Sequence, residues 1–394
     1  NGEQFKESVN NLWQAFQELS TKPAISTNQN LVLQKAELLV TRSQSIYSDL
    51  KSYQSNINQQ IKDDVDRVNE IGNRVYELNL KIQKVEAGGV ETAMTLRDER
   101  DSLLDELGQY GRMDVTEDAT GFCFVDFEGV RFIDDHRCNN IGLNSAKGTG
   151  FYTPYWPQQS DAANEKYVSV FRLEDEISTE MNTDIGGIKS KLLARGDRYG
   201  VASDLTTNEA YDKVSRSTVM EVEAQIDTLF SRIVKAMNDV YCPNVESKDA
   251  ITSVDGTVYP AGTKILDADN CARGVDGKLP PRELFTRVGV DRYTEVTGMD
   301  GKTYYIYNEE DPNNTSTMYS IGSVSINSDL KRQITLMPAY TANGAVDYDF
   351  GHRLANAWNV KDMVLSPDDQ KPCTFEEYYD KVVSQLGIIG NTYQ

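Results

Sequence analysis

The chain has 394 residues, which is more than one hydrophobic core usually holds, so we expect two or three domains. Its 61 acidic and 40 basic residues give a formal net charge of -21, which argues against nucleic acid and anionic membranes as partners because both bind basic surfaces. No apolar run is long enough to span a bilayer, and no signal peptide is visible. The first residues already follow a helical pattern, so we expect the natural N-terminus to lie upstream of Asn1.

The first expected helix covers residues 4–20. Its apolar residues recur every three or four positions, which places them on one face of a helix. They are Phe5, Val9, Leu12, Phe16 and Leu19. The sequence Thr21-Lys22-Pro23 is expected to end this helix, because proline cannot continue one.

Residues 31–85 carry the most informative pattern, a long amphipathic stretch without proline. Its apolar residues recur mostly every three or four positions, and Ser43 is the only polar member of the stripe. They are Ala36, Leu39, Ile46, Leu50, Tyr53, Ile57, Ile61, Val65, Val68, Ile71, Val75, Leu78, Ile82 and Val85. The pattern predicts one very long helix, or two nearly in line, of roughly 80 Å. Gly88 and Gly89 are expected to end it.

A third helix is expected over residues 92–107. Leu96, Leu103, Leu104 and Leu107 should point inward. The outer face is expected to be solvated and to carry local ion pairs, because it mixes both signs of charge. It consists of Arg97, Asp98, Glu99, Arg100, Asp101, Asp105 and Glu106.

The pattern then changes to that of β-structure. Alternating apolar residues between 122 and 133 flank Glu128-Gly129, which predicts a β-hairpin. Residues 140–165 are rich in Asn, Gly, Ser and Pro and predict loops or irregular sheet. Residues 167–172 predict a further strand.

Helices return in the second half of the chain, on either side of another β-rich region. We expect helices over residues 185–195, 208–241, 351–357 and 374–386. The inner face of the 208–241 helix should carry Val214, Val219, Val222, Ile226, Leu229, Phe230, Ile233 and Met237. The inner face of the last helix should carry Phe375, Tyr379, Val382 and Leu386. Residues 243–345 predict a mostly-β domain, with strands near 257–259, 303–307 and 321–326.

These elements predict an α+β fold, a discontinuous bundle of long helices with inserted mostly-β modules. The helical domain would comprise residues 1–114, 184–243 and 346–394. A hairpin-containing insert would cover residues 115–183, and an outer β domain would cover residues 244–345.

Acidic clusters are the first candidates for chemistry, because a glycosidase needs two carboxylates facing each other across a cleft. The clusters are Asp134-Asp135, Glu174-Asp175-Glu176 and Glu309-Glu310-Asp311. In so acidic a chain such clusters arise by chance, so we interpret them as solvated surface. No nucleophile-elbow, zinc-protease, Walker A or dinucleotide-binding motif occurs, and we predict no catalytic, cofactor-binding or metal-binding residue.

Three cysteine and histidine residues, Cys123, His136 and Cys138, come nearest to a metal-ligand set. A zinc site normally needs four ligands, and no fourth ligand is evident, so zinc is not expected. The five cysteines, at 123, 138, 242, 271 and 373, are too widely spaced for a disulfide framework. Free, partly buried thiols are expected, and a single disulfide bond stays open.

Three short sequences resemble functional motifs, and for each a turn or a helix end is the better interpretation. Residues 267–278 loosely resemble a calcium loop, but Ala272 and Lys278 stand where an EF-hand needs Gly and Glu. Met299-Asp300-Gly301-Lys302 is expected to be a hairpin turn. Arg195-Gly196-Asp197 spells an adhesion tripeptide, but here it closes an expected helix and is better explained as a glycine cap.

Several segments, in order, resemble the flagellar hook-associated protein 1 family, which forms the first junction between hook and filament. Residues 96–107, LRDERDSLLDEL, are the most specific match, because the family typically has an L-x-D-x-R-D-x-L-x-x-E-L helix after a glycine-rich turn. The other similar segments are residues 11–23, 35–40, 57–61, 68–82, 185–195, 324–330 and 374–379. Residues 140–180 and 243–315 show no match, and the five cysteines depart from the family pattern.

The resemblance implies a non-enzymatic structural subunit that assembles with copies of itself into a ring-like adaptor. Its other partners would be the hook protein, the second hook-associated junction protein and an export chaperone that binds a C-terminal segment beyond this chain. The protein would be extracellular and exported through the flagellar type III apparatus without a cleaved signal. The family's terminal coiled-coil segments are expected to be missing here. The seam of the long helix would then be buried inside the subunit, against the helices at 208–241 and 374–386.

Two other classes of protein stay open. One is another secreted helical binding protein, such as a secretion-needle tip or an adhesin. The other is a carbohydrate-active enzyme carried on an inserted β domain, which would need two carboxylates facing across a deep pocket within residues 243–345.

Overall fold

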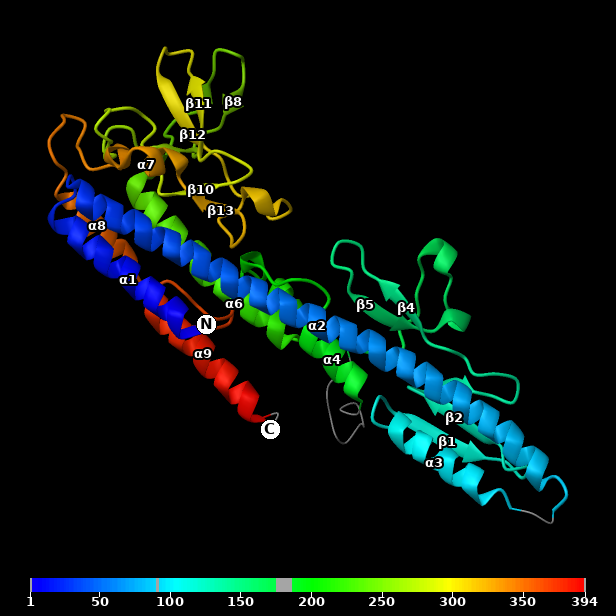
Figure 1. The fold of residues 1–394 in the computed structure, drawn as a ribbon. Coiled ribbons are helices and arrows are strands. Elements are labelled where there is room, and N and C mark those ends of the chain that lie inside the picture. Colours follow the sequence, from blue (N-terminus) through cyan, green and yellow to red (C-terminus); the bar gives the residue numbers. More distant parts are fainter. Residues whose placement is uncertain (1, 90–91, 175–185, 393–394) are drawn as a thin grey trace. The chain divides into compact units, whose positions relative to one another are not determined.

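The structure is a computed structural model that describes residues 2–89, 92–174 and 186–392. The chain forms two compact units (Figure 1). The larger unit comprises Asn1–Asp49, Gly200–Lys213 and Val222–Gln394, and the smaller unit comprises Leu50–Tyr199 and Val214–Glu221. This division separates residues 1–49 from residues 50–114, which the sequence placed in one helical domain. The three-domain partition itself stays a prediction.

The first two helices follow the sequence pattern closely. Helix α1 (Gly2–Thr21) ends two residues before Pro23, as expected. Helix α2 (Ser26–Glu86) is one continuous 61-residue helix, so the single long helix is confirmed, and it begins five residues earlier than expected. Gly89 follows its end with a positive φ of 64°, and the Gly89 N–H donates to the Glu86 carbonyl.

The buried stripe of α2 differs from the expected one near residue 53. Tyr53 is 55% exposed, whereas Gln54 is fully buried. Val85 is also exposed. The prediction that Tyr53 is buried was wrong, because it rested on tyrosine being more apolar than glutamine. In the structure the Gln54 amide has polar partners, since its Nε2 donates to the carbonyls of Arg195 and Arg198.

Helices α1, α8 (Asp349–Trp358) and α9 (Phe375–Thr392) pack against one another in the larger unit (Figure 1). Trp13 of α1 stacks on Trp358 of α8 with ring centroids 5.4 Å apart, and Phe5 of α1 lies 5.4 Å from Tyr379 of α9. Gly351 permits the approach of α1 and α8, because a Cβ there would lie 2.1 Å from the Ser20 Cα.

The expected helix over residues 208–241 is two helices. Helix α5 (Asn208–Val214) and helix α6 (Thr218–Tyr241) are separated by residues 215–217. The Ser217 hydroxyl accepts the Met220 N–H at 3.3 Å, so Ser217 caps the start of α6, and the same hydroxyl donates to the Ala194 carbonyl. The inner face of α6 is buried as expected.

The β-structure of the larger unit consists of small antiparallel sheets. The largest has four strands in the order β11-β12-β9-β6, and two ribbons are formed by β10-β13 and β7-β8. The strands are β6 (Asn244–Glu246), β7 (Ile251–Thr252), β8 (Val258–Tyr259), β9 (Lys264–Leu266), β10 (Phe285–Arg287), β11 (Tyr293–Thr297), β12 (Thr303–Tyr307) and β13 (Val324–Ile326). Met299-Asp300-Gly301-Lys302 forms the turn between β11 and β12, as predicted. A short helix, α7 (Ser328–Arg332), follows β13.

The smaller unit contains helices α3 (Met94–Leu107) and α4 (Gly187–Arg195) and two sheets. Strands β1 (Met113–Glu117), β2 (Cys123–Phe127) and β3 (Val130–Ile133) form one sheet, and β4 (Gly142–Ser145) pairs with β5 (Tyr152–Tyr155). The β2–β3 hairpin was predicted, whereas β1 was not. The strand expected at 167–172 is wrong, because that segment makes only an isolated bridge between Ser169 and Tyr155.

The core of the smaller unit corrects the expected partners of the α2 seam. Residues Ile57, Ile61, Val65, Val68, Ile71 and Val75 belong to one cluster with the aromatic residues of the β segments and with apolar residues of α3 and α4. The other central members are Leu104, Leu107, Phe122, Phe127, Phe132, Trp156, Phe171, Ile188 and Leu192. This half of the seam is buried within the chain, as expected, but against β-structure, α3 and α4 rather than against the helices at 208–241 and 374–386. Among the residues described, no helix is both long enough and apolar enough to cross a membrane.

Candidate functional sites: buried polar contacts between helices and β segments

Three asparagines of α2 bind backbone groups of the segments packed against it in the smaller unit. Each side-chain amide accepts a hydrogen bond from a backbone N–H and donates one to a backbone carbonyl. This is the pair of hydrogen bonds that the backbone of a neighbouring strand would make. The three pairings are Asn58 with Tyr152 N (2.7 Å) and Gly150 O (3.2 Å), Asn69 with Ile141 N (2.7 Å) and O (2.9 Å), and Asn79 with Cys123 N (3.2 Å) and O (2.8 Å). Because about three helical turns separate neighbouring asparagines, all three lie on one face and fix the register of three segments along the helix.

Arg100 of α3 extends the contact at Asn79 into a buried cluster. The Arg100 side chain is 2% exposed, and its guanidinium donates to Glu117 Oε2 (2.6 Å), the Gly121 carbonyl (2.8 Å) and Asn79 Oδ1 (3.2 Å). The Cys123 thiol donates to the same Glu117 oxygen at 3.3 Å. We call Asn79, Arg100, Glu117 and Cys123 the α3 cluster. The expectation of a solvated outer face was therefore wrong for Arg100.

The charges around the α3 cluster favour ionised carboxylates. Burial acts to raise the pKa of Glu117, but hydrogen bonds from Arg97, Cys123 and Arg100 outweigh it and lower that pKa. Nearby, Arg97 forms an ion pair with Glu86 at 2.7 Å. The hydrogen bonds from Arg97 and from the Ala93 backbone N–H lower the pKa of Glu86 to about 2. Burial raises the pKa of the Cys123 thiol to about 12, so this cysteine is not a reactive thiolate.

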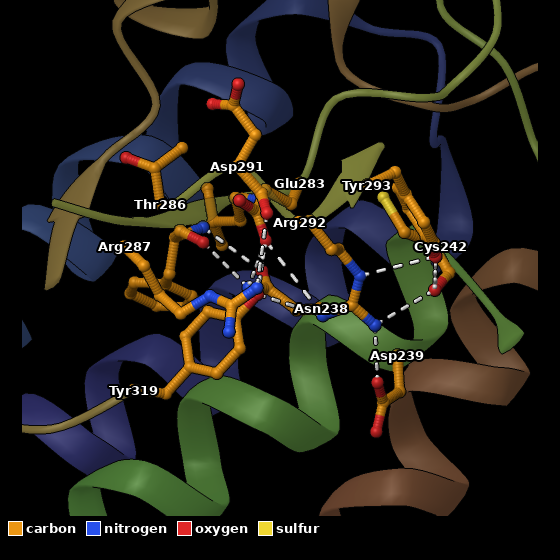
Figure 2. Close-up of polar contacts among 12 residues, drawn as sticks. Asn238, Asp239, Cys242, Glu283, Thr286, Arg287, Asp291, Arg292, Tyr293 and Tyr319 are labelled. Atoms are coloured by element: carbon orange, nitrogen blue, oxygen red, sulfur yellow. Dashed lines mark hydrogen bonds and ion pairs between the residues drawn. The ribbon is translucent and has the colours of Figure 1, made fainter. Parts of the chain in front are cut away.

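A second cluster lies in the larger unit, where the end of α6 meets the β segments (Figure 2). Asn238 of α6 is fully buried. Its Oδ1 accepts the backbone N–H groups of Leu284 and Phe285, both at 3.1 Å, and its Nδ2 donates to Phe285 O (2.7 Å) and Glu283 Oε2 (2.9 Å). A single side chain thus satisfies three backbone groups and one carboxylate.

Two arginines complete this α6 cluster, which we define as Asn238, Glu283, Arg287, Arg292 and Tyr319. Arg292 donates to Asp239 Oδ1 (2.6 Å), to the Cys242 carbonyl (3.1 Å) and to the Tyr319 hydroxyl (3.1 Å). Arg287 donates to backbone carbonyls, among them those of Thr317 and Asn308, and its guanidinium lies over the Tyr319 ring at 4.7 Å. Both arginines are at most 5% exposed.

Glu283 is the carboxylate at the centre of the α6 cluster. Its Oε2 accepts the Tyr319 hydroxyl at 2.7 Å and lies 3.9 Å from Arg292 Nη1. Burial raises the pKa of Glu283 to about 7, against the lowering effect of Arg292. Asp227, also on α6, accepts the N–H groups of Ile321 (2.7 Å) and Ala202 (2.9 Å), and burial raises its pKa to about 6.

These pKa values predict how the stability of the larger unit depends on pH. The pKa of Glu283 is higher in the folded than in the unfolded chain, so the folded state binds the proton more tightly. The free energy of unfolding should therefore increase as pH falls from about 7 to about 4.5, with a contribution of at most about 1.4 kcal/mol per pH unit. Glu283→Gln, which keeps an oxygen for Tyr319 and Asn238, should reduce this slope but not abolish it, because Asp227 acts in the same direction. Urea unfolding between pH 5 and 7.5 measures the slope.

The control for this prediction is Glu309→Gln, at an exposed glutamate paired with Lys264 at 2.9 Å. It should leave the slope as it is in the unchanged protein. An equal reduction in both variants would contradict the assignment to Glu283.

A groove of about 490 Å³ beside the α6 cluster is the place to look for paired carboxylates within residues 243–345. Asp239, Glu246, Glu309 and Glu310 line it together with Lys235, Lys264 and Tyr307. Asp239 is paired with Arg292, Glu309 with Lys264 and Glu310 with Lys235. Glu310 also accepts the Tyr319 backbone N–H. Three of the four carboxylates, Asp239, Glu309 and Glu310, thus serve ion pairs or a backbone hydrogen bond, which does not favour an acid–base pair.

The acidic clusters singled out in the sequence act locally. Asp134 Oδ1 accepts the N–H groups of His136 and Arg137, and Asp311 Oδ1 accepts that of Asn313. The Glu174 cluster runs into residues 175 and 176, which lie outside the described part of the chain.

The residues considered as metal ligands are not brought together. Cys123 belongs to the α3 cluster, the His136 side chain is 85% exposed, and Cys138 lies near Phe132 against Gly72. Over residues 2–89, 92–174 and 186–392 the structure has no group of three or more His, Cys, Asp or Glu that could hold a metal ion. All five cysteines are free thiols.

The Arg195-Gly196-Asp197 tripeptide is a helix end, as interpreted. Helix α4 ends at Arg195, and Gly196 follows it with a φ of 76°. Arg195 is 3% exposed and donates to Asn58 Oδ1 and to the Tyr152 carbonyl, so it is not displayed for a receptor. At Asp267 the calcium-like sequence forms a turn, in which Asp267 accepts hydrogen bonds from Asn270.

Sequence reasoning did not find either polar cluster. The available signal was an amide or a charge at an apolar position of a helix: Asn79 between Leu78 and Leu80, Arg100 between the leucines of α3, and Asn238 next to Met237. A buried polar residue of this kind requires partners, and here the partners come from distant β segments.

Long helices and small antiparallel sheets define an α+β fold. The chain belongs to the family described as "Flagellar hook-associated protein FlgK helical domain", whose sequence model matches residues 1–248. The resemblance found in the sequence is thereby confirmed.

A solved structure shares the fold. It is described as the flagellar hook junction protein FlgK from Burkholderia pseudomallei and is 13% identical in sequence, with a TM-score of 0.50. The alignment covers 86% of this chain and 60% of that one, so the chain spans less than two thirds of that chain's length. Among curated protein sequences, none matches this chain.

Proposed function

We propose that this chain is part of a non-enzymatic structural subunit of the bacterial flagellum that forms the junction between hook and filament. The observation that carries the proposal is the family match over residues 1–248, which includes the whole of α2 and the α3 helix with its characteristic sequence. The fold shared with the hook junction protein of Burkholderia pseudomallei supports it. The needle-tip and adhesin alternatives have no comparable support.

The polar interior fits a structural role better than a catalytic one. Asn58, Asn69, Asn79 and Asn238 are occupied with backbone groups, and Glu283 and Arg100 are occupied with side chains of their own clusters. Groups used in this way hold helices to β segments. Their arrangement does not favour the carbohydrate-active alternative.

The proposed partners are copies of the same protein in a ring-like assembly, the hook protein and the second hook-associated junction protein. An export chaperone would bind a segment outside this chain. The protein would reach the cell exterior through the flagellar export apparatus. The net charge of -21 suits subunits that repel one another until specific contacts form.

Deletion of the gene, with and without complementation, tests this proposal. Cells that lack a hook–filament junction should build hooks, fail to attach filaments and release filament protein into the medium. Complementation with the full-length gene should restore filaments. Normal filaments in the deletion strain would overturn the proposal, and filament protein retained inside the cells would place the defect in export instead.

A further inference from the structure

Two buried thiols lie where α6 ends against the sheet of the larger unit. Cys242 directly follows the last residue of α6 and is fully buried, and Cys271 is 2% exposed. The backbone of Cys242 contacts the α6 cluster. Its carbonyl accepts hydrogen bonds from Arg292 and from the Tyr293 hydroxyl. Figure 2 shows Cys242 beside these two residues.

Backbone pairing brings the second thiol to this place. Strand β6 starts two residues after Cys242 and pairs with β9, Asn244 opposite Leu266. The ladder continues for one more step, since the Asp267 N–H donates to the Pro243 carbonyl at 2.8 Å. This step leaves Cys242 next to the turn that follows β9.

That turn folds Cys271 back toward the start of β6. The Cys271 N–H donates to the Asp267 carbonyl at 3.0 Å, which closes one helical turn, and its thiol approaches the Ala268 carbonyl at 3.7 Å. Both thiols have raised pKa values, chiefly through burial. The backbone pairing places the two cysteines at the same end of the β6–β9 ladder.

We propose that Cys242 and Cys271 form an intramolecular disulfide bond when the protein folds in the presence of a small-molecule disulfide. One thiolate attacks glutathione disulfide, which forms a mixed disulfide and releases one glutathione. The second thiolate then attacks the protein sulfur of the mixed disulfide and releases the second glutathione. The protein loses two protons and two electrons, and glutathione disulfide is reduced to two molecules of glutathione.

The bond would link the end of α6 covalently to the turn that follows β9. The hydrogen bonds of the α6 cluster already connect α6 to the β segments at this place. Burial and raised pKa values make both thiols slow to react in the folded protein, so the bond forms during folding and is afterwards protected from exchange. It would close a loop of about 30 residues, which restricts the unfolded chain and stabilises the larger unit.

Peptide mapping under non-reducing conditions tests the proposal on the unchanged protein. The chain is unfolded in denaturant, refolded with reduced and oxidised glutathione, alkylated and digested with trypsin. Cys242 and Cys271 fall in separate tryptic peptides, residues 236–248 and 265–273. We expect these two peptides to be joined in most molecules, and the oxidised protein to melt about 5 °C higher than the reduced protein.

Cys373→Ser is the matched control, because Cys373 is another buried thiol of the same unit and, like Cys242, donates to a backbone carbonyl, that of Met363 for Cys373 and that of Pro281 for Cys242. It should leave both the joined peptides and the shift in melting temperature unchanged, and Cys271→Ser should remove both. Alkylation of Cys242 and Cys271 after oxidative refolding, or pairing of either with Cys123, Cys138 or Cys373, would overturn the proposal.

Discussion

Asn238→Ala is expected to lower the free energy of unfolding of the larger unit by about 3–5 kcal/mol. The substitution removes four hydrogen bonds. It leaves two backbone N–H groups and the Phe285 carbonyl unsatisfied in the interior, and Glu283 loses one donor. Each unsatisfied buried group costs more than the net value of the bond it loses, because it lost its water on folding. Water can repair little of this, since Asn238 is fully buried.

Tryptophan fluorescence during urea unfolding can measure this loss in the larger unit alone. Trp13 and Trp358 both belong to that unit and stack on each other, so Trp156→Phe leaves only its signal. Asn359→Ala is the control, because that exposed asparagine, which directly follows α8, makes one side-chain bond, to the Ala355 carbonyl of α8. It should cost less than about 0.5 kcal/mol. Equal losses in the two variants would show that the Asn238 contacts do not hold the unit together.

The helices and the β2–β3 hairpin could be predicted because their causes are local. In α2, apolar residues recur at helical spacing over 61 residues without a proline, and no other regular structure fits that pattern. In the hairpin, Glu128 and Gly129 both have positive φ, 51° and 77°, as the tightest hairpin turns require. Such features are visible in a few neighbouring residues.

The errors arose where distant segments decide the outcome. Gln54 replaces Tyr53 on the buried stripe because carbonyls some 140 residues away accept its amide. Residues 167–172 alternate like a strand, yet only Ser169 finds a bridge partner. The break between α5 and α6 depends on Ser217, whose hydroxyl binds the Ala194 carbonyl. None of these three contacts can be predicted from the residues next to it in the sequence.

The two units share one arrangement where a helix contacts a β segment through buried polar residues. Asn79 and Asn238 are both fully buried helical asparagines whose amides pair with the backbone of a β segment. Next to each lies a buried arginine paired with a carboxylate, Arg100 with Glu117 and Arg292 with Glu283. Apolar packing is nondirectional, whereas the hydrogen bonds of these amides form only when the β segment lies in one register against the helix. They therefore specify where each β segment lies along its helix.

Arg100→Ala is expected to destabilise the smaller unit by about 3–5 kcal/mol. The side chain is the cation of the α3 cluster, and its loss leaves Glu117 Oε2, the Gly121 carbonyl and Asn79 Oδ1 each without one donor. Trp156 is the only tryptophan of the smaller unit, so its fluorescence reports the loss once Trp13 and Trp358 are replaced by phenylalanine.

The contrast with an exposed arginine shows why burial, and not the ion pair as such, sets the size of this effect. Arg74 pairs with Glu99 at 2.6 Å, as short as the Arg100 pair, but its side chain is 38% exposed. Water can replace its partner at little cost, so Arg74→Ala should change the free energy of unfolding much less than Arg100→Ala does. A loss at Arg100 no larger than that at Arg74 would mean that the α3 cluster is solvated in solution. The asparagine pairings would then hold the β segments without it.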